Sequence, residues 1–352
     1  MGGMAGRIRI AFGQFRELKE EDLLFARQLG ASGVTLNTPL FRGRSVYGVD
    51  IFIEGRKGET QASPWAHPGR WDFMEIVQVR SLVEAYGLKL EAIENTPISF
   101  YDKALLGLPG RDEQIGNYQQ IIRMLGKAGI PILGYHWMPG EVWRTSTSTP
   151  GRGGARVSSF DLDLAKEAPP AFSHPISEEQ LWANYEYFIR AVLPVAEEAG
   201  VKLALHPDDP PTDEPLGGVA RIMNGLKGFR RAMEIGDSPN HGLDFCVGSW
   251  ASRSVGEMFD ALRYFGPRGK IFYVHLRNVR GSVPRFEETF IDEGDVDVVA
   301  VLRELLEMGF EGFIIDDHVP KMVNDTAWGH RGRAFATGYI MGALRALQPH
   351  RS

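Results

Sequence analysis

The chain has 352 residues, 43% of them hydrophobic, so it can bury a large core in one big α/β barrel or in two ordinary domains. Its net charge of -6, from 39 basic and 45 acidic residues without a basic run, argues against nucleic acid and anionic membranes as partners. No apolar stretch reaches the roughly 18 residues of a membrane-spanning helix and the first residues lack a signal-peptide pattern, so we expect a cytoplasmic protein.

Segments typical of strands and helices alternate along the chain. Short apolar runs bounded by turn formers predict strands at 9–15, 33–39, 89–97, 130–139, 201–211, 242–250, 271–279 and 312–319. Amphipathic runs, several followed by glycine, predict helices at 18–29, 71–86, 113–128, 177–199, 229–233, 255–265, 296–308 and 333–347. Ser177 and Gln180 fit a capping box at the start of the fourth helix.

Eight strand–helix pairs predict a parallel sheet that closes into a (β/α)8 TIM barrel, with 1–352 as one domain. A doubly wound open sheet is the alternative, but no GxGxxG follows the first strand. Two segments interrupt the alternation: an elaborated polar loop after the second strand, and a Ser-, Thr- and Gly-rich loop over 140–175 after the fourth. Loops of this length are typically functional lids or disordered segments.

Four strand ends carry residues that bind metals. His206, Cys246, His275 and Asp317 follow the fifth to eighth strands, and in a barrel such ends meet at one mouth. A single histidine at a strand end is more often a structural hydrogen-bonding residue, and a free cysteine is usually a small buried hydrophobe. Four candidates on four consecutive strands favour a metal site. Two imidazoles, a thiolate and a carboxylate suit Mn²⁺, Fe²⁺, Co²⁺ or Zn²⁺ better than Mg²⁺.

Several motifs resemble the mannonate dehydratase family of the UxuA type. They are HPDDPP at 206–211, CVGS at 246–249, HLRN at 275–278, GDVD at 294–297 and the Asp-His pair at 317–318, with YHWMP at 135–139 and the following WRT similar to further family segments. The resemblance spans most of the chain. It implies a metal-dependent barrel of hexuronate breakdown that removes water from D-mannonate and forms 2-keto-3-deoxy-D-gluconate.

The resemblance also implies roles for individual residues. The family binds Mn²⁺ through a His, a Cys, a His and an Asp, which correspond here to His206, Cys246, His275 and Asp317. His318 is the candidate for one of the proton transfers, because imidazole titrates near neutral pH.

Other residues near these motifs are candidates for substrate binding. Arg277 and Asn278 can hold the substrate carboxylate or hydroxyls, with a salt bridge in the barrel mouth as the alternative for the arginine. Asp208 either orients a ligand imidazole or caps a turn. His136 ends the fourth strand, and Glu94 ends the third, where it binds hydroxyls or forms a buried ion pair.

The chain departs from the family pattern after the Asp-His pair. The family has a PGY segment there, whose tyrosine takes part in proton transfer, whereas this chain has Trp328 and His330 and no tyrosine. His330 is therefore a second acid–base candidate.

Three functions stay open at this point. The first is a sugar-acid dehydratase, and the second is a metal-dependent isomerase, epimerase or lyase resembling xylose-isomerase-like barrels, which usually present Glu, Asp, His and Glu rather than a cysteine. The third is a barrel that binds sugar acids without catalysis. The expected partner is a small sugar acid, and a homo-oligomer is the default for such barrels.

Overall fold

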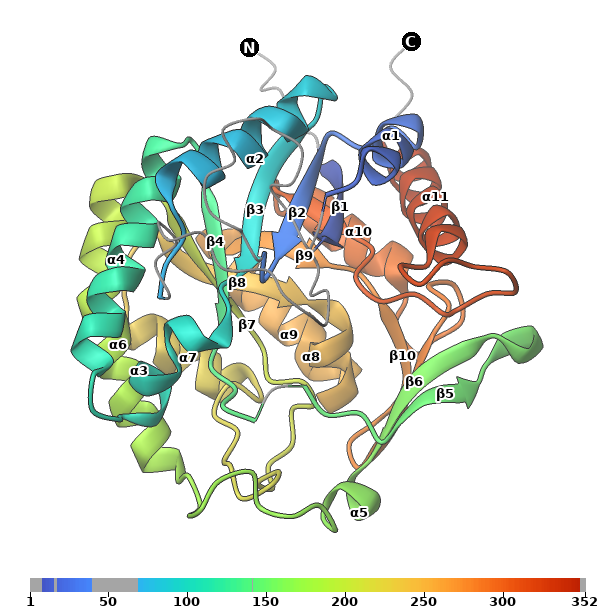
Figure 1. The fold of residues 1–352 in the computed structure, drawn as a ribbon. Helices are drawn as coiled ribbons and strands as arrows, with labels where there is room; N and C mark the ends of the chain where they lie inside the picture. Colours follow the sequence, from blue (N-terminus) through green and yellow to red (C-terminus); the bar gives the residue numbers. More distant parts are fainter. Residues whose placement is uncertain (1–7, 16–17, 40–68, 141, 349–352) are drawn as a thin grey trace, which may run out of the picture.

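The protein is described by a computed structural model that covers residues 8–15, 18–39, 69–140 and 142–348. Within these ranges, eight parallel strands close into a barrel in the order β1-β12-β9-β8-β7-β4-β3-β2 (Figure 1). They are β1 (Arg9–Phe15), β2 (Gly33–Asn37), β3 (Lys89–Asn95), β4 (Ile132–His136), β7 (Lys202–His206), β8 (His241–Cys246), β9 (Ile271–His275) and β12 (Phe313–Ile315). The predicted TIM barrel is confirmed.

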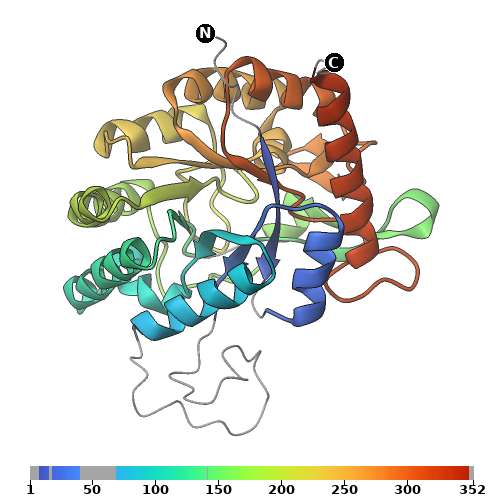
Figure 2. The same ribbon diagram turned by 90° about the horizontal axis from the view of Figure 1, so that it is seen from above.

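Helices cover the outside of the barrel, as Figure 2 shows. They are α1 (Glu20–Gln28), α2 (Phe73–Ala85), α4 (Arg111–Lys127), α6 (Glu178–Ala199), α7 (Leu226–Ile235), α9 (Val255–Phe265), α10 (Val298–Glu307) and α11 (His330–Leu347). At the start of α6, Ser177 accepts a hydrogen bond from the Gln180 backbone N–H at 3.2 Å, and the helix ends at Gly200 with φ of 66°. None of the helices in the described ranges is long and apolar enough to span a bilayer.

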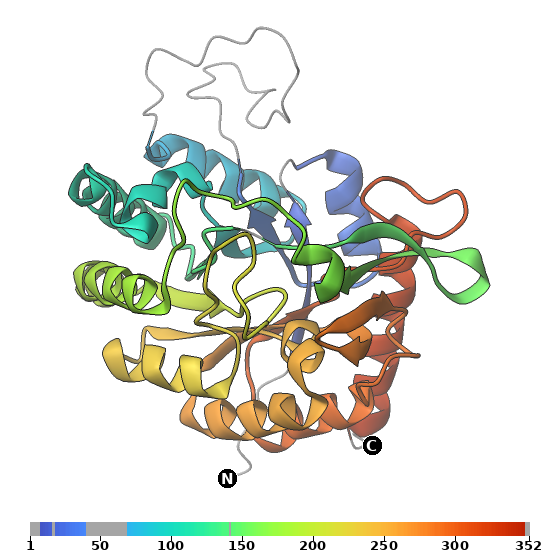
Figure 3. The ribbon, with the colours of Figure 1, turned by 90° about the horizontal axis from the view of Figure 1, so that it is seen from below.

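The segment 140–175 is not the irregular loop that its composition predicts. It contains β5 (Ser146–Pro150), β6 (Arg156–Asp161) and the short α5 (Leu162–Ala165). Strands β5 and β6 join β10 (Asn278–Ser282) and β11 (Arg285–Thr289) in an antiparallel sheet of order β10-β11-β6-β5, which we call the accessory sheet. Figure 3 shows the β5–β6 hairpin extending beyond the barrel on one side. The prediction missed it because polar, exposed strands lack an apolar pattern.

Several predicted strands extend too far. The chain leaves the sheet after Cys246 and turns directly into α8 (Val247–Arg253), and the predicted strand 271–279 is split between β9 and β10. Two short elements, η1 (Ile98–Phe100) and α3 (Asp102–Leu106), fill the connection after β3. The predicted elaborated loop after the second strand falls mostly on residues 40–68, outside the described residues.

The barrel interior is apolar at one end and polar at the other. Its apolar layer consists of Ala11, Ala92, Ile132, Ala204, Phe272, Tyr273, Phe313 and Ile315. A second, larger core lies between the strands and the surrounding helices. Because side chains alternate along a strand, the residue two positions after an interior residue also faces the interior. Polar residues at the strand ends that follow an interior residue by two positions therefore also face the interior, at the mouth of the barrel.

Candidate metal centre and active site

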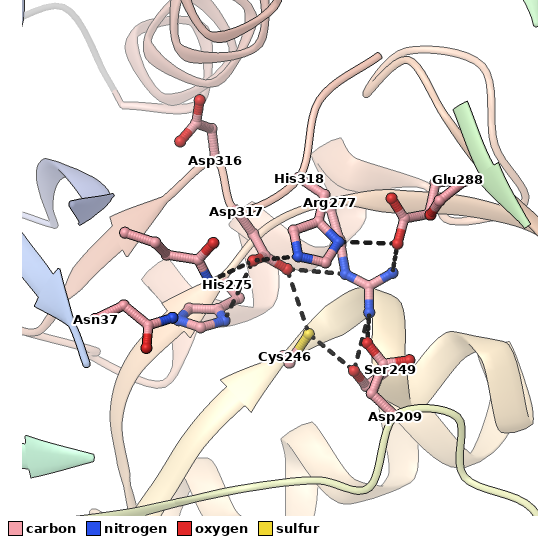
Figure 4. A network of polar contacts seen from close by, with 12 residues as sticks. Asn37, Asp209, Cys246, Ser249, His275, Arg277, Glu288, Asp316, Asp317 and His318 are labelled. Carbon is pink, nitrogen blue, oxygen red and sulfur yellow. Dashed lines mark hydrogen bonds and ion pairs between the residues drawn. The ribbon is translucent and has the colours of Figure 1, made fainter. Parts of the chain in front are cut away.

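The four candidate ligands are brought to the mouth by strand alternation. Ala204 and Tyr273 belong to the apolar interior layer, and His206 and His275 follow them by two residues on the same strands. The ligand atoms of His206, Cys246 and His275 all lie within 4.8 Å of one another. Asp317, just beyond β12, completes the group: its Oδ2 is 3.6 Å from Cys246 Sγ and its Oδ1 is 3.7 Å from His275 Nδ1 (Figure 4).

The hydrogen bonds of these residues leave ligand atoms available for a metal. His206 Nδ1 donates to the Pro207 carbonyl at 2.7 Å, which leaves Nε2 as a lone-pair donor. His275 is fully buried, and its Nδ1 has no hydrogen-bond partner among the described residues. Burial raises the pKa of the Cys246 thiol, but the positive charge of Arg277 and the nearby imidazoles of His206 and His275 lower it to about 5 overall. The side chains thus fit a divalent transition metal bound by two nitrogens, a thiolate and a carboxylate.

Two carboxylates lie behind His275, on the side away from Asp317. Its Nε2 is 3.2 Å from both Glu94 Oε1 and Asp244 Oδ2, and all three side chains are buried. Glu94 also accepts hydrogen bonds from Gln14 at 2.9 Å and from Thr35 at 3.2 Å. Carboxylates in this position orient a ligand imidazole and increase its basicity. Glu94 is thus a buried partner of His275. Its contact with substrate hydroxyls stays a prediction.

Arg277 is already fully engaged by other side chains. Its Nη2 donates to Asp209 at 2.8 Å and to Ser249 at 3.0 Å, its Nη1 donates to Glu288 at 3.0 Å, and its Nε lies 2.8 Å from Asp317 Oδ2 (Figure 4). The side chain is 1% exposed. These contacts form a salt bridge in the barrel mouth. A contact of Arg277 with a substrate carboxylate stays a prediction.

Asn278 and Asp208 are likewise occupied in holding the backbone. Asn278 Nδ2 donates to the carbonyls of Ile291 and Val296, and its Oδ1 accepts from the backbone N–H of Val296 at 3.1 Å. Asp208 is fully buried and accepts from the Met223 backbone N–H at 2.8 Å. These contacts give both residues a structural role, while Oδ1 of Asp208 has no hydrogen-bond partner among the described residues. Their roles in substrate binding stay predictions.

His318 is the candidate acid–base residue that stays accessible. Its side chain is 39% exposed, its Nδ1 is 2.9 Å from Glu288 Oε1, and its Nε2 is 3.6 Å from Asp317 Oδ1. Burial lowers the pKa of its imidazole, but the carboxylates of Asp317 and Glu288 outweigh burial, so the pKa is raised above 6.5. His318 therefore combines exposure to the mouth with direct contact to the ligand group.

His136 ends β4 beside His206 on β7, with which it is paired in register. Its Nε2 is 3.3 Å from Tyr101 Oη, and its Nδ1 accepts weakly from the Met138 backbone N–H at 3.4 Å. Burial and the neighbouring His206 lower the pKa of His136 to about 3, so its ring is neutral at physiological pH. The structure places it at the mouth, where a substrate contact remains a prediction.

His330 is not brought to the centre. It begins α11, where its Nδ1 is 2.6 Å from Thr326 Oγ1 and its Nε2 is 3.2 Å from Asp22 Oδ1 on α1. Its ring packs edge-on against Phe25 and Trp328. Nε2 joins α11 to α1, and Nδ1 contacts the loop before α11. The acid–base role of His330 stays a prediction, to which these contacts add no support. Trp328 stacks on Phe15 at 4.7 Å between ring centroids, which identifies it as a packing residue.

Comparison with known proteins identifies the family of this chain. The profile of the D-mannonate dehydratase (UxuA) family matches residues 45–172 and 166–352. A mannonate dehydratase of Streptococcus equi subsp. zooepidemicus is 35% identical over 307 residues, which cover 78% of this chain and 83% of that protein. The chain belongs to the mannonate dehydratase family.

Solved structures agree with this assignment. The crystal structure of mannonate dehydratase from Streptococcus suis serotype 2 matches with a TM-score of 0.83 and 30% identity, covering 97% of this chain and 94% of that one. A xylose isomerase domain protein from Planctomyces limnophilus matches with a TM-score of 0.60 and 15% identity, covering 97% and 98%. The second likeness shows a shared barrel fold alone.

The sequence analysis missed several residues of this candidate centre. Asp244 had a usable signal, because it lies two positions before Cys246 on one strand and therefore faces the same side. Ser249 is the last residue of the CVGS motif, and its Oγ donates to Cys246 Sγ at 3.1 Å. Glu288 had no signal, because strand β11 was not predicted, and Arg144 belongs to the WRT segment, from which the sequence predicted no role for it.

Proposed function

We propose that this chain is a metal-dependent D-mannonate dehydratase that forms 2-keto-3-deoxy-D-gluconate and water. The observation that carries the proposal is the convergence of His206, Cys246, His275 and Asp317 in a member of the mannonate dehydratase family. We assign these four residues as the metal ligands.

The reaction requires two proton movements. A base removes the proton from C2, an acid protonates the departing 3-hydroxyl so that it leaves as water, and the resulting enol becomes the 2-keto product. A bound divalent ion supplies positive charge next to the substrate carboxylate, where negative charge develops. We assign one of the two proton transfers to His318, because its side chain is partly exposed and also lies beside Asp317, one of the proposed ligands.

We further propose Mn²⁺ as the ion, the cytoplasm as the location and a homo-oligomer as the working form. The mixed nitrogen, sulfur and oxygen donors support a borderline ion such as Mn²⁺, with Fe²⁺, Co²⁺ and Zn²⁺ as competitors. The unpaired Cys246 supports a reducing compartment. Metal analysis of protein grown without added metal and light scattering of the purified chain test the first and third points.

The decisive experiment is turnover of D-mannonate by protein that has been stripped of metal and resupplied with Mn²⁺, with release of the 2-keto-3-deoxy acid followed over time. We expect activity that depends on the metal and is lost in His318→Asn. Bound metal without turnover of D-mannonate would overturn the substrate assignment and direct the search to other sugar acids.

A further inference from the structure

The accessory sheet delivers two charged side chains to the active site. Arg144 lies just before β5 and Glu288 lies on β11, so neither belongs to a barrel strand. Arg144 Nη2 donates to Glu288 Oε1 at 2.7 Å, and its Nη1 and Nη2 donate to the two oxygens of Asp209 at 2.8 Å each. The hairpin is therefore tied to the loop that follows His206.

A single oxygen atom of Glu288 receives hydrogen bonds from three side chains. Besides Arg144, Oε1 of Glu288 lies 3.0 Å from Arg277 Nη1 and 2.9 Å from His318 Nδ1 (Figure 4). An ionised carboxylate oxygen can only accept hydrogen bonds, so His318 carries a hydrogen on Nδ1. The ring is then turned with Nε2 towards Asp317, at 3.6 Å from its Oδ1.

Glu288 belongs to a buried group of oppositely charged side chains. Arg144 and Arg277 supply two positive charges, while Asp209 and Glu288 supply two negative ones, and the exposed fractions of their side chains are between 1% and 11%. Charged hydrogen bonds at such burial are strong and hold a fixed geometry. If Glu288 moved away, two buried guanidinium groups would each lose a charged partner, which is energetically costly.

We propose that Glu288 is the positioning residue of His318, and that Arg144 holds Glu288 in place from the accessory sheet. Glu288 fixes the rotation and the Nδ1–H tautomer of the imidazole, so that Nε2 faces the substrate side of the metal centre. The role of His318 in proton transfer rests on the proposed function, whereas the orientation of its ring does not. The accessory sheet thereby becomes part of the catalytic apparatus.

The kinetic test compares Glu288→Gln with Glu287→Gln in the Mn²⁺-loaded enzyme. Glu287 lies on the same strand, but its carboxylate pairs with the half-exposed Arg280 at 2.8 Å, which makes it a matched control. We expect Glu288→Gln to lower kcat by about 10- to 100-fold with KM changed less than threefold, because misplacing a reacting group costs up to about 10²-fold. Glu287→Gln should stay within twofold, and Glu288→Asp should recover part of kcat.

A second readout does not need the substrate. In Zn²⁺-loaded protein with ¹⁵N-labelled histidine, long-range nitrogen–proton spectra report which nitrogen of His318 carries the hydrogen, and His318→Asn assigns the signal. At a pH high enough for the ring to be neutral, we expect the hydrogen on Nδ1 in the native protein and an altered pattern in Glu288→Gln. This readout separates the two proposals, because inactivity of the native enzyme on D-mannonate overturns the function alone.

Two results would overturn the positioning role. The first is that Glu288→Gln keeps the native kcat and the native His318 signal. The second is that Glu288→Gln and Glu288→Asp lose bound metal and folded protein to the same extent, which indicates a structural role only. If Glu288→Gln does not fold, Arg144→Lys replaces it, with Arg152→Lys on the same hairpin as the control, since Arg152 pairs with Asp292 nearer the surface. Arg144→Lys should lower kcat and alter the His318 signal, and failure to do either would overturn the proposal.

Discussion

Arg277 Nε lies 2.8 Å from Asp317 Oδ2, so a fully buried guanidinium holds one of the four proposed metal ligands from behind. The same oxygen faces Cys246 Sγ at 3.6 Å. Two motifs that are separate in the sequence, HLRN and the Asp-His pair, therefore act as one unit. The arginine keeps the carboxylate and the thiolate charged and directed at the same point.

Replacing Arg277 with Gln should damage both stability and metal binding. The change leaves Asp209, Glu288 and Asp317 buried without their shared cation, which costs about 3–5 kcal/mol of the free energy of unfolding. We expect Mn²⁺ affinity to fall by about 10- to 100-fold, as when the outer partner of a metal ligand is lost. Urea unfolding and metal titration measure the two effects. Arg280→Gln, which breaks a half-exposed ion pair, should change stability by less than about 1 kcal/mol.

Replacing Cys246 with Ala should separate an enzyme from a simple sugar-acid binder. We expect Mn²⁺ affinity to drop by more than about 100-fold and turnover to disappear, since losing only an outer partner of a ligand already costs about 10- to 100-fold. Ser249→Ala keeps the thiolate but removes its 3.1 Å donor, and should show a smaller loss. Calorimetric titration of metal, followed by sugar acid, gives both affinities. Unchanged sugar-acid binding in metal-free Cys246→Ala would favour a non-catalytic binder.

Close contact with Arg277 explains why the Cys-x-Gly-Ser motif has a glycine at position 248. A Cβ at this position would lie 2.5 Å from Cγ and 2.9 Å from Cζ of Arg277, so the arginine would have to move. We expect Gly248→Ala to destabilise the protein by about 1–3 kcal/mol through overpacking and to weaken Mn²⁺ binding. Gly338→Ala in α11, where a Cβ meets no atom within 4 Å, should instead stabilise by up to about 1 kcal/mol. Thermal unfolding with and without Mn²⁺ compares the variants.

His241 should make stability depend on pH. It is fully buried, with Nε2 2.8 Å from Tyr135 Oη and Nδ1 2.8 Å from the Gly236 carbonyl, and burial lowers its pKa to about 4. As the pH falls, His241 of the unfolded chain becomes protonated near pH 6.5, whereas His241 of the folded chain stays neutral until about pH 4. The contribution of His241 to the free energy of unfolding is therefore complete above pH 6.5 and is lost as the pH falls towards 4. The loss reaches about 3 kcal/mol.

Urea unfolding between pH 7 and pH 4 measures this dependence. His241→Gln is expected to be less stable at pH 7 and to show a shallower decline towards pH 4. His174→Gln, at an exposed position, should decline as the native protein does. An equal decline in His241→Gln and the native protein would show that other groups cause the acid sensitivity.

Much of the barrel could be predicted from the sequence because it depends on local patterns. Apolar runs with turn formers located all eight barrel strands, and the end of α6 at Gly200 follows from the ease with which glycine adopts a positive φ. The ends of β8 and β9 were placed too late, because the chain leaves the sheet where no local signal marks the change. The accessory sheet was missed because its pairing joins segments far apart in sequence.

The sequence by itself determined that His206, Cys246 and His275 end neighbouring strands and face one mouth, because alternation along a strand and the closure of eight strands fix this geometry. Only the tertiary structure decided which polar groups remain free for chemistry. Arg277 bonds Asp209 across 68 residues and Arg144 bonds Glu288 across 144, and such partners use up donors and acceptors that look available in the sequence. A hydrogen bond forms only between groups that are close in space, however far apart they are in the sequence. The role of a polar residue therefore follows from its neighbours in the fold.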